Sequence, residues 1–164
     1  MKIVRYILVL LLVLVWSVGL PAEPVVDTVL VRKGERKMQL LSAGEVIRTY
    51  RISLGANPDG HKQREGDQRT PEGTYLLDYK KKDSAFYRAT HISYPNEDDV
   101  KRAAANKVDP GGQIMIHGQR NGYEKFTRLF QRFDWTGGCI AVTNREMDEI
   151  WELVEVNTPI IIEP

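Results

Sequence analysis

The stretch Gln-Ile-Met-Ile-His-Gly at residues 113–118, followed by Asp-Trp-Thr-Gly-Gly-Cys-Ile-Ala-Val-Thr-Asn at 134–144, decides how the chain is organised. It holds the only cysteine of the sequence, and its histidine closes a short apolar run. A cysteine attacks as a thiolate, so a nucleophilic Cys139 needs a base beside it, and His117 is the best candidate. The alternative is that Cys139 is an inert, buried apolar side chain.

The residues around this pair fit an acyl-transfer site. Residues 114–116 are predicted to form a buried strand that delivers His117 to a sheet end, where a side chain is held rigidly and still faces a cleft. Gly137 and Gly138 allow a tight turn and leave room for a substrate. The backbone amides near Gly138 and Cys139 are expected to hold a developing oxyanion.

The N-terminus predicts an export signal. A positively charged start is followed by an apolar run over 6–16 and a small residue, Ala22, at a plausible cleavage point. The apolar run is shorter than the ~20 residues that span a bilayer comfortably. We therefore expect residues 1–22 to be a signal peptide and 23–164 to be an exported domain in the periplasm or cell envelope. The alternative is an uncleaved membrane anchor.

The expected export bears on the role of the lone cysteine. In exported domains, cysteines usually occur in pairs that form disulfides. A single Cys139 cannot form an intramolecular bridge and risks oxidation, so a chain that retains it is expected to use it.

Composition narrows the remaining possibilities. Residues 23–164 are long enough for one domain with a real core. The net charge of +1, with Lys and Arg spread along the chain, does not favour nucleic-acid binding. The three histidines, His61, His91 and His117, show no metal-site spacing, so we predict no metal and no cofactor.

Strands are expected to dominate the fold. β-branched runs between turns predict strands at 26–31, 37–41, 46–54, 74–79, 91–94, 114–116 and 160–162, and residues 140–142 continue as an apolar run after the cysteine. The run Lys-Lys-Lys-Asp at 80–83 is interpreted as a turn. Helices are predicted from Asn96 to Ala105 and after the capping box of Thr143 and Glu146.

Four aromatic residues recur at helical spacing between the histidine and the cysteine: Tyr123, Phe126, Phe130 and Phe133. This pattern favours one helix that packs an aromatic face on the core. The alternative is that the segment forms a wall of the cleft, with the nearby cations meeting substrate carboxylates. These cations are Arg120, Lys125, Arg128 and Arg132.

Residues 55–73 have the composition of a long loop that carries charges of both signs. Loops of this length in compact domains are usually functional or disordered, so this loop either lines a cleft for a zwitterionic substrate or is a solvated surface loop. It contains His61, a second candidate base. His61 ranks below His117 because it lies among flexible polar residues, and His91 is expected to be structural.

Taken together, these residues resemble the active-site signature of the L,D-transpeptidase (YkuD-type) family. That signature is His-Gly, a spacer, and Ser/Thr-His-Gly-Cys, which 117–118 and 136–139 match except that Gly137 replaces the second His. The run Arg-Thr-Pro-Glu-Gly at 69–73 is similar to another family segment before a strand. Ala141 stands where many members have Arg or Asn, and this form is similar to a divergent branch that includes enzymes detaching proteins from the cell wall.

The resemblance implies a mostly-β fold, a β-sandwich with a few short helices. It also implies a cysteine acyltransferase acting on peptidoglycan stem peptides through a thioacyl-enzyme, with Cys139 as nucleophile and His117 as general acid and base. Gly138 would supply the oxyanion amide, and Thr136 or a backbone carbonyl would orient the site. The expected substrate-binding residues are Arg69, Thr70, Gly118 and Gly137.

Two other functions stay open at this level. One is a hydrolase of the same chemistry, an L,D-carboxypeptidase or an amidase releasing wall-linked protein, for which a wall-attached protein is substrate or acceptor. The other is a non-catalytic wall-binding domain in which Cys139 is vestigial.

Overall fold

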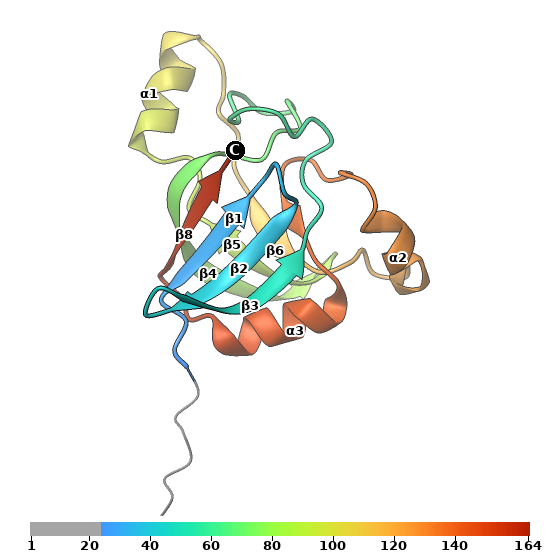
Figure 1. Ribbon diagram of the computed structural model, residues 1–164. Helices are drawn as coiled ribbons and strands as arrows, with labels where there is room; N and C mark the ends of the chain where they lie inside the picture. Colours follow the sequence, from blue (N-terminus) through green and yellow to red (C-terminus); the bar gives the residue numbers. More distant parts are fainter. Residues whose placement is uncertain (1–23) are drawn as a thin grey trace, which may run out of the picture.

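The structure, a computed structural model, describes residues 24–164 (Figure 1). The predicted export signal and its cleavage point lie outside the described residues. Within the described part of the chain, no helix is both long and apolar enough to cross a membrane.

Eight strands and three short α-helices make up the domain, so the mostly-β prediction is confirmed. The strands are β1 Thr28–Arg32, β2 Lys37–Ser42, β3 Glu45–Arg51, β4 Gly73–Ser84, β5 Tyr87–Ile92, β6 Met115–His117, β7 Ile140–Ala141 and β8 Thr158–Glu163. The helices are α1 Glu97–Ala105, α2 Thr127–Phe130 and α3 Asn144–Leu153, with a 3-10 turn, η1, at Glu124–Phe126.

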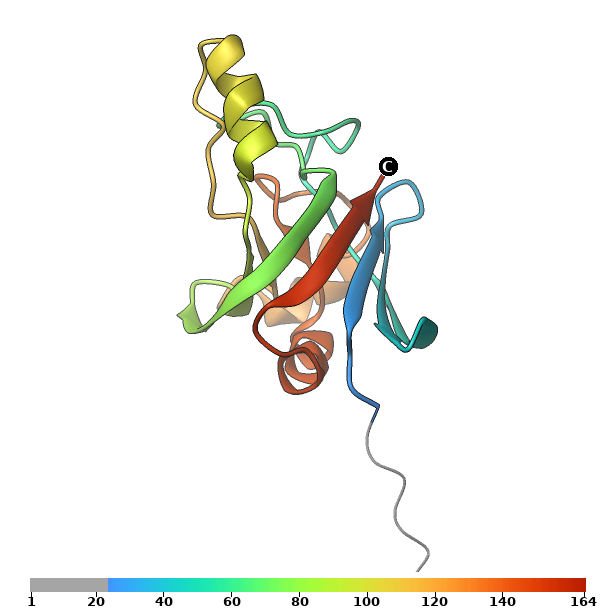
Figure 2. The ribbon, with the colours of Figure 1, turned by 90° about the vertical axis from the view of Figure 1, so that its left-hand side faces the viewer.

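The strands form one sheet in the order β3-β2-β1-β8-β4-β5-β6-β7. Figure 2 shows β1, β8 and β4 side by side at its centre. The sheet curls until its two ends meet, because Ser53, just after β3, exchanges backbone hydrogen bonds of 2.8 and 2.9 Å with Ala141 of β7. A second bridge joins Gly55 to Thr136. The curled sheet thus holds the segment before Cys139 from both sides.

The core fills the inside of this curl. Leu40, Leu77, Ile116 and Ile160 come from different strands and are all fully buried. Burying one such side chain contributes roughly 1.5–3 kcal/mol, so these positions stabilise the sheet that carries the site. Helix α3 lies across one end of the sheet and buries Met147 and Ile150 (Figure 1).

Helix α3 begins where the sequence predicts it. The side chain of Thr143 accepts a hydrogen bond from the Glu146 amide, and the Glu146 carboxylate accepts one from the Thr143 amide. The same reciprocal arrangement at Asn96 and Asp99 starts α1. Both caps satisfy backbone donors that a helix start leaves without partners.

The turn predicted at 80–83 was wrong. Strand β4 continues through these residues to Ser84, which pairs with Tyr87 at the tip of a β4–β5 hairpin. Strand β5 accordingly begins at Tyr87 and not at 91. Residues 80–83 have strand conformation because β5 supplies hydrogen-bond partners along this arm.

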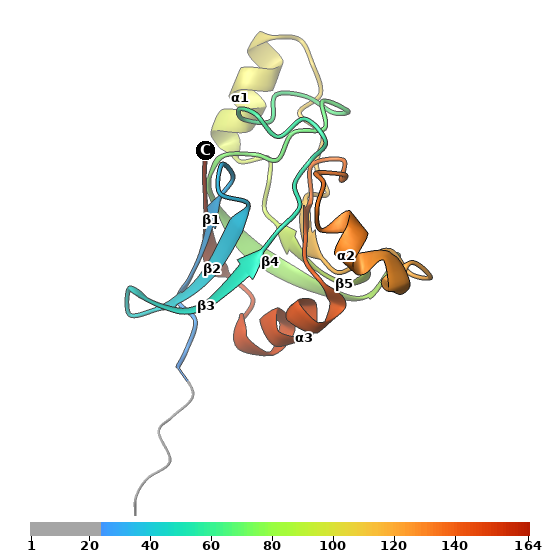
Figure 3. The same ribbon diagram turned by 45° about the vertical axis from the view of Figure 1, so that its right-hand side comes forward.

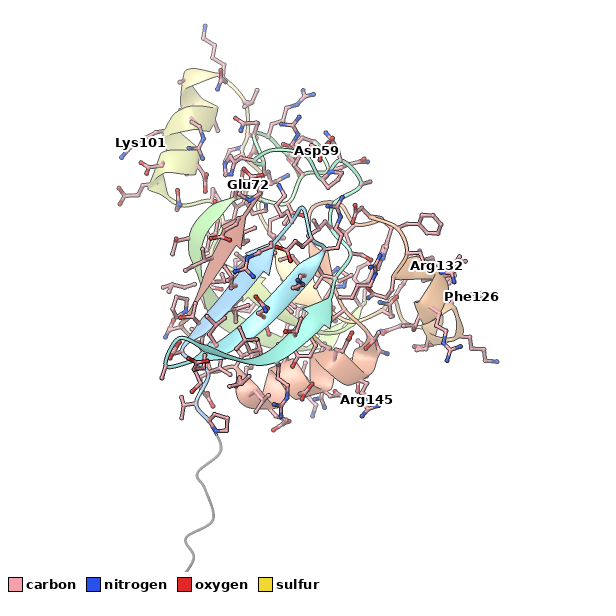
Figure 4. The ribbon with its side chains drawn as sticks, in the orientation of Figure 1. Asp59, Glu72, Lys101, Phe126, Arg132 and Arg145 are labelled. Atoms are coloured by element: carbon pink, nitrogen blue, oxygen red, sulfur yellow. The ribbon has the colours of Figure 1, made fainter. Side chains whose placement is uncertain are left out.

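The prediction of one aromatic helix packed on the core was also wrong. The segment 124–130 is split into η1 and α2, and it projects from the body of the domain (Figure 3). Phe126 is 52% exposed and Phe133 is 61% exposed. Figure 4 shows the labelled Phe126 and Arg132 at the outer rim of the molecule. Only the inner end of the segment approaches the site, where Phe130 lies 5.6 Å from Trp135 between ring centroids.

Candidate active site

His117 ends β6 and is 4% exposed. Its backbone is fixed on both sides, by Ala89 of β5 and Ala141 of β7. Its ring Nδ1 lies 2.6 Å from the backbone oxygen of Gly118. Since a carbonyl only accepts, Nδ1 carries the proton, and Nε2 is left with a free lone pair. This tautomer suits a general base.

Aromatic side chains surround the His117 ring. Phe86 lies 4.6 Å and Trp135 lies 5.8 Å from it between ring centroids. They exclude water from the imidazole, and burial lowers the pKa of His117 to about 4, although its hydrogen bond to Gly118 acts in the opposite direction. His117 is therefore neutral at pH 7 and able to take a proton.

A tight turn presents the cysteine. The hydroxyl of Thr136 donates to the backbone oxygen of Cys139 at 2.7 Å and accepts from the Gly138 amide at 3.1 Å. Gly138 has φ +130°, and a Cβ there would lie 2.6 Å from the backbone oxygen of Arg69. The turn therefore requires glycine at 138, both for its conformation and for this close approach.

The Cys139 thiol lies 3.7 Å from the backbone oxygen of Gln113, to which it donates. Burial raises the pKa of the Cys139 thiol. A backbone hydrogen bond from Met115 and the charge of Lys62 act in the opposite direction and do not outweigh burial. Cys139 is thus a thiol at neutral pH, and a base would have to remove its proton before it could attack as a thiolate.

One cleft of about 360 Å³ contains both groups. Its walls are largely apolar, and a single β4–β5 hairpin supplies one side. The lining residues are Lys81, Ser84, Ala85, Phe86, Ala89, Gln113, Met115, His117, Trp135, Thr136, Gly137 and Cys139. The structure therefore brings the base and the nucleophile expected from the sequence into one largely apolar cleft.

Thr136 does not orient His117; the Gly118 carbonyl makes the hydrogen bond to the ring. Thr136 instead holds the turn before Cys139. The Gly138 amide, expected to face an oxyanion, already donates to Thr136 and lies inside the turn. Gly118 therefore fixes the orientation of the His117 ring, whereas Thr136 and Gly138 fix the conformation of the turn before Cys139.

The four residues expected to bind substrate fall into two groups. Gly137 lines the cleft and has open space around its Cα. Arg69, Thr70 and Gly118 do not line it. Thr70 is fully buried and accepts a hydrogen bond from the Gly55 amide at 3.1 Å, and the carbonyl of Arg69 packs against Gly138. These residues therefore lie outside the cleft and pack against the segments that form it.

The other two histidines lie outside the cleft. His61 accepts from the Glu72 amide at Nδ1, and its Nε2 lies 2.9 Å from Asp99 of α1. His91 stacks on Tyr79, with ring centroids 4.5 Å apart. Both rings have structural partners, and residues 24–164 contain no cluster of three or more His, Cys, Asp or Glu side chains that could hold a metal ion.

Reasoning from the sequence missed several residues of the site. Phe86, Lys81 and Lys62 come from segments far from the motif, and nothing in their local pattern marks them. Trp135 directly precedes the Thr-Gly-Gly-Cys run, and a large aromatic residue beside a nucleophile is a signal that could have been used.

The YkuD family model, described as the L,D-transpeptidase catalytic domain, matches residues 26–162. This match covers most of the chain, including both site segments. The chain belongs to this family.

Two relatives show where the chain stands in the family. It is 33% identical over 128 residues to YafK of Escherichia coli (strain K12), an L,D-transpeptidase by name, covering 74% of this chain and 44% of YafK. It is 28% identical to Pgp2 of Campylobacter jejuni, whose crystal structure is titled as a helical cell shape determining protein, with a TM-score of 0.63 over 84% of this chain and 47% of Pgp2. The chain thus spans less than half the length of these relatives.

More distant structures share the fold alone. An L,D-transpeptidase fragment from Xylanimonas cellulosilytica superposes with a TM-score of 0.56 at 15% identity, over 87% of this chain and 62% of that one.

Proposed function

We propose that the protein is an exported, cysteine-dependent L,D-transpeptidase that acts on peptidoglycan stem peptides containing meso-diaminopimelate. The observation that carries this proposal is the shared cleft of Cys139 and His117, in a chain of the L,D-transpeptidase family. The lone cysteine and the predicted signal support a location in the periplasm or cell envelope.

The resting pair is neutral, because burial raises the pKa of Cys139 and lowers that of His117. Nε2 of His117 takes the thiol proton as Sγ attacks the carbonyl at the L-centre of diaminopimelate. The imidazolium then gives this proton to the departing amine of the terminal D-amino acid. A thioester to Cys139 remains.

The Gly138 amide is engaged by Thr136, so we assign the oxyanion to the amide of Cys139 itself. Gly137, which has open space, allows the substrate carbonyl to approach this point. The second half of the reaction reverses the proton movements. An amine acceptor gives up its proton to His117 and forms the new amide, and the proton returns to the Cys139 thiolate.

Water in place of the amine gives hydrolysis by the same chemistry. The similarity to YafK and to a cell shape determining protein favours wall remodelling without separating these outcomes. A wall-attached protein is a second kind of substrate or acceptor under this proposal.

Purified protein and a tetrapeptide stem test the mechanism. Cys139→Ala and Cys139→Ser should both abolish release of terminal D-alanine, since a serine hydroxyl is a far weaker nucleophile than a thiolate. Either change should cost stability only modestly, on the order of 1 kcal/mol. Retained acyl transfer in either variant would rule out the covalent mechanism, and unfolding near room temperature would make Cys139 a core residue.

Histidine variants and products complete the test. His117→Gln should remove activity, whereas His91→Gln, outside the cleft, should retain it. The wild-type rate should persist down to about pH 4, where His117 becomes protonated. Cross-linked products from muropeptides indicate a transferase, trimmed monomers a hydrolase, and binding without turnover a binding module.

A further inference from the structure

Lys81 and His117 stand in one row of the sheet. In the β4–β5 register Lys81 pairs with Ala89, and in the β5–β6 register Ala89 pairs with His117. Directly paired residues place their side chains on the same face of a sheet. Two strand spacings of ~4.8 Å put the Cα atoms of Lys81 and His117 about 10 Å apart.

The residue between them is small. Ala89 is 1% exposed and lines the cleft, as do Lys81 and His117. Because Ala89 has only a methyl group, it does not fill the cleft between the base and the lysine, which lie on either side of it in the sheet. A substrate held at Cys139 can therefore extend past His117 and Ala89 towards Lys81 within the same cleft.

Lys81 is the charged side chain of the cleft at neutral pH. His117 is neutral there because of its low pKa, and the other lining residues are apolar or uncharged. Within residues 24–164, Lys81 makes no ion pair or side-chain hydrogen bond. Its neighbour Lys80, on the opposite face of β4, donates to the backbone oxygen of Trp151 at 2.6 Å.

The charge acting on the nucleophile comes from elsewhere. Lys62 is the cation that lowers the pKa of the Cys139 thiol, and it is buried and paired with Asp67 at 2.8 Å. Lys81 therefore has neither a structural partner nor an assigned role in activating the thiol. A lone ammonium group beside apolar walls is complementary to an anion on the ligand.

We propose that Lys81 is a specificity-determining residue that binds a carboxylate of the substrate remote from the scissile bond. The carboxylate at the D-centre of diaminopimelate fits, because a flexible chain of methylenes separates it from the carbonyl that Cys139 attacks. The proposal rests on the proposed function for the identity of the substrate, but the carboxylate preference can be measured without catalysis.

The test compares two stem tetrapeptides that differ only in amidation of the D-centre carboxylate. Binding is measured by calorimetry to the Cys139→Ala protein, and KM by D-alanine release with the active protein. The carboxylate peptide should bind at least about 10-fold more tightly than the amide, as is typical of a charge-assisted hydrogen bond. Lys81→Ala should remove this preference, Lys81→Glu should reverse it, and Lys81→Arg should retain most of it.

Lys82→Ala is the matched control. Lys82 follows Lys81 on the same strand, carries the same charge and does not line the cleft, so its removal should leave the preference unchanged. The pH dependence of Cys139 alkylation should be the same in Lys81→Ala and wild type, which separates substrate binding from an effect on the thiol.

An unchanged preference in Lys81→Ala, an equal loss in Lys82→Ala, or a preference that follows the terminal carboxylate would overturn the proposal. Binding that depends on Lys81 in a protein without turnover would leave this proposal standing and reject the proposed function. Turnover with no Lys81-dependent preference would do the reverse.

Discussion

Two long segments flank the site, and each has side chains whose burial differs from what its composition suggests. Residues 55–72 are rich in charge, yet Thr70 is fully buried and the side chain of Lys62 is 3% exposed. Residues 120–133 are rich in aromatic side chains, yet Phe126 and Phe133 are more than half exposed. The polar segment is anchored by a few buried residues, whereas the aromatic one has no buried residue and projects from the domain (Figure 3).

The difference is one of available partners. Lys33, itself buried, donates to the backbone oxygens of Gly60 and Thr70 and to the carboxylate of Glu72. Asp67 accepts from Lys62 and from three backbone amides. Buried polar groups that have hydrogen-bond partners cost little stability. These bonds fix the charged loop, and the loop contacts the turn before Cys139 through the carbonyl of Arg69. The aromatic segment packs mainly on itself.

Breaking the contact between the packed loop and the nucleophile turn should have the largest effect. Gly138→Ala places a Cβ 2.6 Å from the backbone oxygen of Arg69, at a φ of +130°. We expect a loss of about 2–4 kcal/mol in the free energy of unfolding and loss of turnover. Urea denaturation and D-alanine release measure the two effects.

Gly137→Ala is the control for this substitution. A Cβ at Gly137 meets nothing within 4 Å, and its φ is not in the left-handed region. Its stability should stay within ~0.5 kcal/mol of wild type. Equal stability losses in the two variants would show that the loop does not support the turn as the structure indicates.

Acid should weaken the packed loop through Asp67. Burial pushes the pKa of this carboxyl up, but the hydrogen bonds from Lys62 and the backbone outweigh burial and lower it to about 2. Because its pKa is lower than the unfolded value of ~3.9, its contribution is full above about pH 4 and is lost as the pH falls towards 2. Urea unfolding between pH 7 and 2.5 should show this loss.

Asp67→Asn should lower stability at pH 7 by roughly 1–3 kcal/mol, since it leaves Lys62 buried without its counter-ion, and should flatten the acid dependence below pH 4. Asp59→Asn, at an exposed position of the same loop (Figure 4), should do neither. If the two variants lose stability identically as the pH falls, Asp67 is not the group that weakens the loop in acid.

The projecting segment should give the smallest effect. Phe126→Ser combined with Phe133→Ser should change the free energy of unfolding by less than ~1 kcal/mol, because both rings are largely in solvent. Leu54→Ala, at a fully buried position, should cost about 2–5 kcal/mol. A loss above ~2 kcal/mol in the double variant would mean that the aromatic cluster stabilises the domain after all.

Several strands, the two helix starts and the central pair of the site could be predicted from the sequence, because they depend on local residue chemistry. The alternating strands, the caps at Asn96 and Thr143, and the short strand leading to His117 follow from residue type and spacing. So does the placing of His117 and Cys139 in one cleft, because a thiol nucleophile needs a base.

The features that the sequence did not predict depend on packing partners that are distant along the chain. Helical spacing from Tyr123 to Phe133 predicts a face but not what covers it. The run Lys-Lys-Lys-Asp at 80–83 has the composition of a turn, and only its pairing with β5 shows that it is part of a strand. Arg69 and Thr70 were expected to contact substrate, and only the packing of their loop against Gly138 shows that they lie behind the site.

The position of β8 has a consequence for the order in which the sheet assembles. β8 lies between β1 and β4 in the sheet, pairing in parallel with β1 and antiparallel with β4. β1 can pair with its neighbour β2 early, because the two strands are close in sequence, whereas its pairing with β8 joins segments far apart along the chain. Such long-range pairings are slow to form, so we expect the eight-stranded sheet to be completed late in folding, when residues 158–163 dock between β1 and β4.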